Sequence, residues 1–93
     1  MAKYRKKPVV IEAVQWLGSK LSFDEIQAMG DVPWKPGPMG SESFLIETLE
    51  GDHTVSLNDF VIKGVQGEFY PCKPDIFAAT YEAVDPPGAK GGA

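Results

Sequence analysis

Four short β-forming runs follow one another in the second half of the chain, each bounded by Gly, Asn, Asp or Pro. They cover residues 44–50, 53–57, 60–63 and 68–72. Such runs favour strands, and connections this short join antiparallel neighbours. The pattern therefore predicts a β-meander, an antiparallel sheet in which consecutive strands pair.

Two further elements are expected before the meander. Residues 4–16 are rich in Val and Ile and lack glycine, which predicts a strand that pairs with a strand of the meander. Ser22 is a favoured N-cap, Glu25 stands where a capping box needs it, and Gly30 suits a helix end. A short helix is therefore predicted over residues 23–29.

The remaining segments are defined by their prolines. Three prolines predict a loop over residues 31–43, because neither a helix nor a strand can run through them. Pro74 suits the first turn of a short helix that includes Phe77 and Tyr81. Residues 82–84 suit a last edge strand, and residues 85–93 are too polar and rich in Gly and Pro to order themselves.

These elements predict an α+β fold. It has a small twisted antiparallel sheet of four to five strands, one short packed helix and a short C-terminal helix, in a single domain over residues 1–84 with a disordered tail over residues 85–93. The expected core comprises Phe44, Ile46, Val55, Leu57, Phe60, Ile62, Phe69, Phe77 and Tyr81. Because this core is thin, a homodimer is compatible with the sequence.

The charge is unevenly distributed along the 93 residues. Nine basic and 13 acidic residues give a net charge of −4. Lys3, Arg5, Lys6 and Lys7 lie in the first seven residues, the basic arm (residues 1–7), so the remainder carries five basic and 13 acidic residues, a net charge of −8. A nucleic-acid binder needs basic residues over its folded surface, so nucleic acid is not an expected partner. The arm suits a solubilising strand edge, and contact with phosphate or with an acidic partner is the alternative.

Cellular location is inferred from two features. No apolar run approaches the length needed to cross a membrane, and no secretory signal is recognisable. Cys72 is the single cysteine, which excludes an internal disulfide and is typical of a reducing compartment. The sequence therefore predicts a cytoplasmic protein without a membrane segment.

The residues that usually carry catalysis are scarce. His53 and Cys72 are the only His and Cys, whereas a structural zinc site needs four N or S ligands. His53 is expected to be a solvent-facing neighbour of a turn, and Cys72 a small buried hydrophobe on another strand. No metal, no cofactor and no enzymatic activity are predicted.

Two sets of residues are candidates for binding. Trp34, Lys35, Met39 and Tyr70 form the candidate surface for a partner protein, because exposed aromatic residues often anchor interfaces. The alternative for Trp34 is that it folds back to cap the core. Lys63, Tyr70 and Lys73 are the polar candidates for a small-ligand site.

Two blocks resemble a group of small uncharacterised proteins encoded by bacteriophages and prophages, including those of actinobacteria. The blocks are YRKKPVVIEAVQW, residues 4–16, and GEFYPCKPDIFAATYE, residues 67–82, about a third of the chain. In that group the turn before the third strand of the meander is commonly Pro-Gly-Asp followed by an aromatic residue. Here Asn58 stands in place of the glycine, and Asn is the non-glycine residue that best tolerates a left-handed turn.

This resemblance implies a phage gene product that acts in the cytoplasm of the host bacterium, and it implies no reaction. The leading hypothesis is a non-catalytic accessory protein that binds a host protein and modulates host physiology or defence. Two alternatives remain: a small protein that binds a nucleotide signal and counters host defence, and a minor component of the virion.

Overall fold

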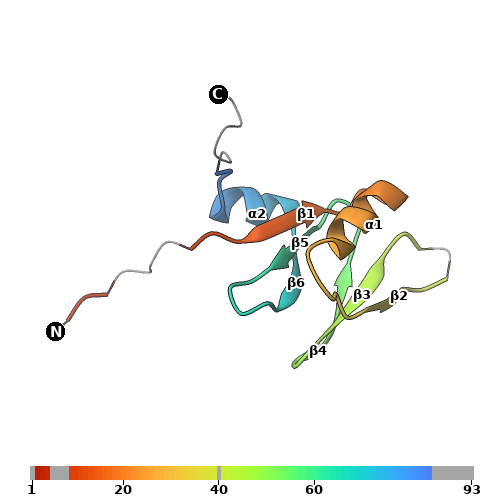
Figure 1. Cartoon of the computed structure of the whole chain (residues 1–93), viewed down its shortest axis with the longest axis horizontal. Coiled ribbons are helices and arrows are strands. Elements are labelled where there is room, and N and C mark those ends of the chain that lie inside the picture. The colour runs from red at the N-terminus through yellow and green to blue at the C-terminus, as the bar shows by residue number, and fades with distance from the viewer. Residues whose placement is uncertain (1, 5–8, 40, 85–93) are drawn as a thin grey trace.

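The structure, a computed structural model, describes residues 2–4, 9–39 and 41–84 (Figure 1). Over these residues the elements are β1 (Glu12–Gln15), α1 (Lys20–Gln27), β2 (Trp34–Pro36), β3 (Phe44–Thr48), β4 (Gly51–Val55), β5 (Phe60–Lys63), β6 (Phe69–Cys72) and α2 (Pro74–Thr80). The predicted α+β class is confirmed. The tail predicted over residues 85–93 lies outside the described residues.

The strands form two antiparallel sheets and not the single sheet that the sequence predicts. One has the order β1-β5-β6 and the other β2-β3-β4. The expected pairing of the N-terminal strand with the meander is confirmed, since β1 pairs with β5 from Glu12 opposite Lys63 to Gln15 opposite Phe60. This strand is shorter than the predicted residues 4–16.

The predicted meander is split between the two sheets at the turn before β5. Hydrogen bonds with Trp16, which follows β1, hold this turn. The Trp16 N–H donates to the Asp59 carbonyl at 2.8 Å, and the Asn58 N–H donates to the Trp16 carbonyl at 2.7 Å. The buried Asp59 carboxylate accepts from the Ser56 N–H at 2.9 Å. These bonds direct the chain into a new sheet where a hairpin was expected. Asn58 has a φ of 76°, which confirms the expected left-handed turn.

The prediction of a loop throughout residues 31–43 is wrong, because strand β2 lies within this segment. Trp34 pairs opposite Ile46 and Pro36 opposite Phe44, at the edge of the sheet. An edge strand tolerates proline because one of its sides needs no N–H donor. At the other end of the chain, residues 82–84 form no strand, so the predicted last edge strand is wrong.

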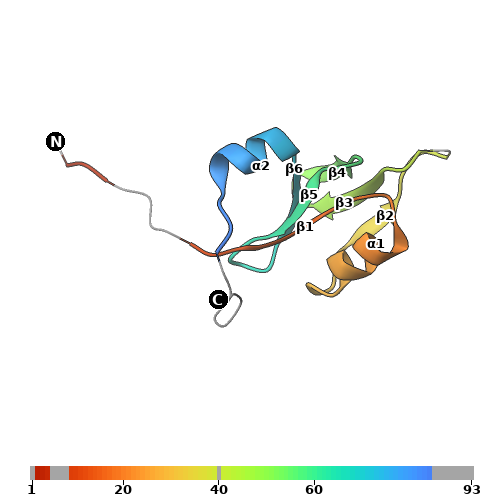
Figure 2. The same cartoon turned by 90° about the horizontal axis from the view of Figure 1, so that it is seen from above.

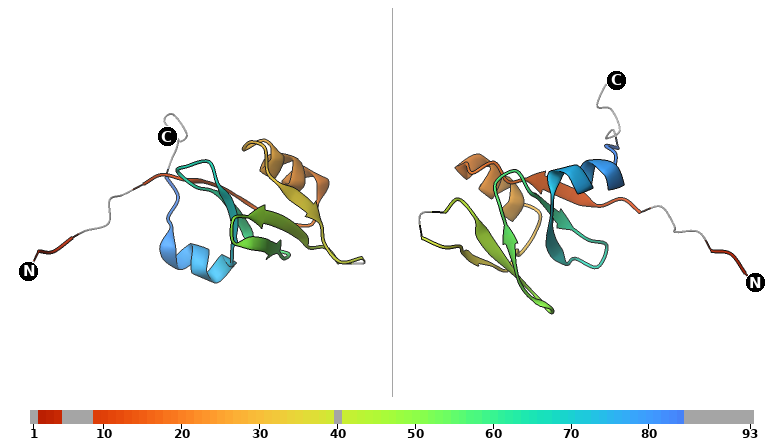
Figure 3. Two further views of the ribbon diagram at one scale, coloured as in Figure 1. Left: turned by 90° about the horizontal axis from the view of Figure 1, so that it is seen from below. Right: turned by 180° about the vertical axis from the view of Figure 1, so that it is seen from behind.

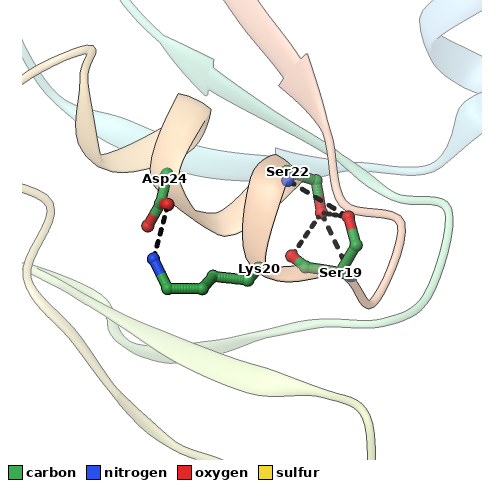
Figure 4. Close-up of polar contacts among 4 residues, drawn as sticks. All are labelled: Ser19, Lys20, Ser22 and Asp24. Atoms are coloured by element: carbon green, nitrogen blue, oxygen red, sulfur yellow. Dashed lines mark hydrogen bonds and ion pairs between the residues drawn. The ribbon is translucent and has the colours of Figure 1, made fainter.

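Helix α1 begins three residues before the predicted start, with Ser19 and not Ser22 as its N-cap. The Ser22 N–H donates to Ser19 Oγ at 3.2 Å, and the Ser19 N–H donates to Ser22 Oγ at 3.3 Å, which together form a capping box (Figure 4). Ser22 thus occupies the position predicted for Glu25. Lys20 and Asp24 form an ion pair on the exposed side.

Ser19→Ala is expected to lower the free energy of unfolding by about 1 kcal/mol, because the first turn of α1 loses its side-chain acceptor. Ser19→Asp should retain most of the stability, since Asp is an equally good N-cap. Urea unfolding followed by tryptophan fluorescence measures both. Equal stability of Ser19→Ala and the parent chain would argue against Ser19 as the cap.

The main core lies between the two sheets and beneath α1. Its buried residues are Ile26, Val32, Phe44, Ile46, Val55, Val61 and Phe69. Helices α1 and α2 lie on opposite sides of the molecule (Figures 2 and 3). The sheet β1-β5-β6 therefore has the main core on one face and α2 on the other.

A smaller apolar cluster lies under α2. Ile62 is fully buried there, and Phe60 stacks on Phe77 with ring centroids 3.9 Å apart. Five predicted core residues are buried: Phe44, Ile46, Val55, Ile62 and Phe69. Phe60, Phe77 and Tyr81 are only half-buried. The prediction that Leu57 belongs to the core is wrong, because Leu57 lies in the turn after β4 and is 43% exposed.

Candidate functional site

A cleft of about 750 Å³ is lined by residues from both sheets. The end of β3, the β3–β4 turn and β4 form one wall, and the start of β6 forms the other. The lining residues are Asp31, Pro33, Glu47, Thr48, Leu49, Glu50, His53, Gly67, Glu68, Phe69, Tyr70 and Pro71.

The wall from β3 and β4 is shaped by a tight turn. Thr48 pairs opposite Gly51, which leaves Leu49 and Glu50 at the tip. Thr48 Oγ1 donates to the Gly51 carbonyl at 2.7 Å and accepts from the Glu50 N–H at 3.1 Å. Gly51 has a φ of 113°, which disfavours other residues. The turn therefore holds Leu49 and Glu50 at the mouth of the cleft.

The opposite wall is fixed by the turn between β5 and β6. The Gly64 N–H donates to the Glu68 carbonyl at 2.7 Å, and Glu68 Oε1 accepts from the Gln66 N–H at 3.0 Å. Phe69 follows directly and is buried against the main core. The cleft thus combines an apolar base with a carboxylate held at its rim.

The cleft is strongly acidic. Four of its lining residues carry carboxylates, Asp31, Glu47, Glu50 and Glu68, and none is Lys or Arg. None of the ion pairs among the described residues involves Asp31, Glu50 or Glu68. A hollow lined by one sign of charge concentrates counter-ions and ligands of the opposite sign. The site therefore favours cationic groups.

Glu47 is the exception among these carboxylates, because it is paired. On the outer face of the β2-β3-β4 sheet, Lys35 Nζ lies 2.9 Å from Asp52 and 3.2 Å from Glu47. Hydrogen bonds to Asp52 and then Glu47 raise the pKa of Lys35 above its ordinary value. The ammonium group of Lys35 therefore lies on the outer face of the sheet, and Lys35 does not line the cleft.

The expectation that His53 is a solvent-facing neighbour of a turn is wrong. The turn falls at Leu49 and Glu50, two residues before the predicted Gly51-Asp52, so His53 lies two residues further into the strand than predicted, opposite Ile46. It is half-buried and lines the cleft.

Tyr70 lines this cleft from the edge strand β6 and interacts with Tyr81, the residue that follows α2. Burial raises the pKa of Tyr70 from 10.0 to about 12, with smaller contributions from a hydrogen bond with Tyr81 and the charge of Glu68. The hydroxyl therefore stays protonated in the folded protein well above neutral pH.

A spectrophotometric titration should show one tyrosine ionising near pH 12, and Tyr70→Phe should remove this step. The raised pKa has a consequence for stability. The contribution of the protonated hydroxyl is fully present below the unfolded value, near pH 10.0, and is lost as the pH rises towards 12. The parent chain should therefore lose more stability over this interval than Tyr70→Phe. Retention of the step in Tyr70→Phe would contradict the assignment.

Trp34 lies in a different hollow, of about 400 Å³, with Trp16, Phe23 and Phe44. Its ring meets Phe23 edge to face with centroids 4.9 Å apart, yet Trp34 remains 42% exposed. Both interpretations from the sequence therefore hold in part, since Trp34 covers the core and also offers a free surface.

Met39 is fully exposed in the following loop. With Lys35 on the outer face and Tyr70 in the cleft, the four predicted partner-binding residues do not form one surface.

The alternative ligand set is also separated. Lys63 Nζ donates to the Met29 carbonyl at 2.8 Å, and Lys73 Nζ pairs with Asp59 at 3.2 Å. Asp59 precedes β5 and Lys63 ends it, so the two ammonium groups lie at opposite ends of that strand. The structure does not bring Lys63, Tyr70 and Lys73 together.

Cys72 and His53 lie on different sheets. Burial raises the pKa of the half-buried Cys72 thiol, with smaller effects from Asp59 and Asp75, which lowers its thiolate content at neutral pH. Among the described residues, no three His, Cys, Asp or Glu side chains are grouped so as to hold a metal ion.

Sequence reasoning identified Tyr70 but missed the carboxylates of the cleft. Glu50 and Glu68 each adjoin a glycine of a tight turn, and two such turns carry the rim. A Glu beside a turn glycine is recognisable in the sequence. Whether the β3–β4 and β5–β6 turns line one cleft depends on how the two sheets pack.

Helices of membrane-spanning length and apolarity are absent from the part of the chain that the structure describes. Comparison with family models, curated proteins and solved structures found no match for this chain. The resemblance to phage proteins therefore stays a prediction.

Proposed function

We propose that this chain is a non-catalytic binding protein whose cleft takes a basic, extended segment of another protein. The observation that carries this proposal is the charge of the cleft, where the carboxylates of Asp31, Glu50 and Glu68, which form no ion pair among the described residues, and no Lys or Arg line an opening of about 750 Å³. A cleft of this size accommodates several side chains.

The chemistry of the walls favours a peptide over a simple cation. Pro33, Leu49, Phe69 and Pro71 offer apolar surface beside the carboxylates. Lys and Arg match such a site because their aliphatic stems pack on apolar surface while the charged ends meet carboxylates. The edge strands β4 and β6 border the cleft, and an extended segment can hydrogen-bond to the free side of an edge strand.

The proposed context follows the sequence resemblance. The partner of a phage accessory protein in the host cytoplasm would be a host protein. The cleft would bind a Lys- or Arg-rich segment of that protein. Binding of a nucleotide signal is less favoured, because the carboxylates of the cleft repel phosphate, and Lys63 and Lys73 do not line the cleft and bond to Met29 and Asp59.

Selection from a random peptide library against the immobilised full chain at low salt tests this proposal. We expect enriched peptides to carry several Lys or Arg residues beside apolar ones. Trp34→Ala should select the same peptides, because Trp34 lies in the other hollow. Enrichment of acidic or uncharged peptides, or loss of enrichment in Trp34→Ala, would contradict the proposed site.

A further inference from the structure

We propose that the basic arm of one copy of this chain occupies the acidic cleft of a second copy, so that the protein associates with itself. This inference rests on the proposed function, because it uses the same cleft, and it names one particular basic segment as an occupant.

Charge complementarity is the first argument. Lys3, Arg5, Lys6 and Lys7 give the arm four positive charges, whereas the rest of the chain carries −8. Asp31 and Glu50 are exposed at the cleft and form no ion pair among the described residues. The arm therefore supplies the sign of charge that the cleft lacks.

Exposure of apolar residues around the arm is the second argument. Tyr4 is 94% exposed and Val10 is 75% exposed. Residues 2–4 lie well away from both sheets (Figure 1). Such residues gain from burial against a partner, and the apolar walls of the cleft offer a matching surface.

The local sequence favours a second copy over the chain's own cleft. Pro8 fixes its own φ and restricts Lys7 to extended conformations. The following Val9, Val10 and Ile11 are β-branched, and residues 2–11 contain no Gly, Asn or Asp that would favour a reversal. Residues 9–11 continue the line of β1 away from the sheets (Figure 1), and the sequence before them favours an extended arm over one that folds back.

Reciprocal exchange strengthens the association. Two copies related by a twofold axis would form the same contact twice, each giving an arm and a cleft. Once the first arm is bound, the second contact forms at high effective concentration. Exchange of arms also increases the buried surface of a domain whose core is small.

Sedimentation velocity of the full chain tests this inference. We expect a dimer at about 50 mM salt and a monomer at about 500 mM, since screening weakens contacts between exposed charges. Lys3→Glu with Lys6→Glu should abolish the dimer, and so should Asp31→Lys with Glu50→Lys. Glu25→Gln with Glu82→Gln, which removes two exposed carboxylates away from the cleft, should leave the dimer intact.

A charge exchange separates specific docking from general repulsion. The chain with all four changes, Lys3→Glu, Lys6→Glu, Asp31→Lys and Glu50→Lys, regains the net charge of −4 and should regain the dimer. A monomer at all salt concentrations, or a dimer that the arm changes do not affect, would overturn this inference. Either result leaves the proposed function standing if the peptide selection still enriches basic peptides, which distinguishes the two failures.

Discussion

Ile46→Ala is expected to lower the free energy of unfolding by about 2–5 kcal/mol, the usual cost of removing a large buried aliphatic side chain. Ile46 lies in the middle of β3, is fully buried and belongs to the cluster that includes Ile26 of α1 and Phe69 of the other sheet. The cavity would therefore weaken the contact between all three. Urea unfolding followed by tryptophan fluorescence measures the loss.

Leu49→Ala is the matched control, because Leu49 is fully exposed at the tip of the β3–β4 turn. Its free energy of unfolding should stay within about 0.5 kcal/mol of the parent chain. Equal losses for the two variants would mean that the sheets do not share the core described above.

Asp31→Asn with Glu50→Gln is expected to weaken binding of a selected basic peptide by about tenfold at low salt, which corresponds to about 1.4 kcal/mol. Both carboxylates lie at the cleft, and neither forms an ion pair among the described residues, so their loss removes attraction without breaking a described contact. The difference from the parent chain should shrink at high salt, because exposed charges are screened. Fluorescence anisotropy of a labelled peptide measures both affinities.

Glu25→Gln with Glu82→Gln removes the same charge from exposed positions outside the cleft. Peptide affinity should change much less in this control. If both double variants lost affinity equally, net charge and not the cleft would govern binding.

The sequence predicted most of the elements because their signals are local. The run over residues 60–63 and the helix from Pro74 appear where their patterns placed them, and Asn58 adopts the left-handed turn. The division into two sheets was not predictable in this way. It depends on bonds between Trp16 and the turn at Asn58 and Asp59, which are distant in sequence and invisible to periodicity.

The candidate site was less predictable for the same reason. Tyr70 was identified, but Glu50 and Glu68, which line the same cleft, come from turns of two different sheets. The exposure of His53 was mispredicted because the turn before β4 falls at Leu49-Glu50, so that His53 lies two residues inside the strand and not at its first position. Gly51 is typical of a turn, which favours a turn at residues 51–52, yet it is the first residue of β4.

A two-dimensional amide NMR titration with a selected basic peptide tests the central claim most directly. Peptide bound in the acidic cleft should shift the amide signals of Asp31, residues 47–50, His53 and residues 67–70, which line it. Signals of the aromatic hollow around Trp34 should stay in place. Shifts centred on Trp16, Phe23 and Trp34, with those of the cleft unchanged, would contradict the account.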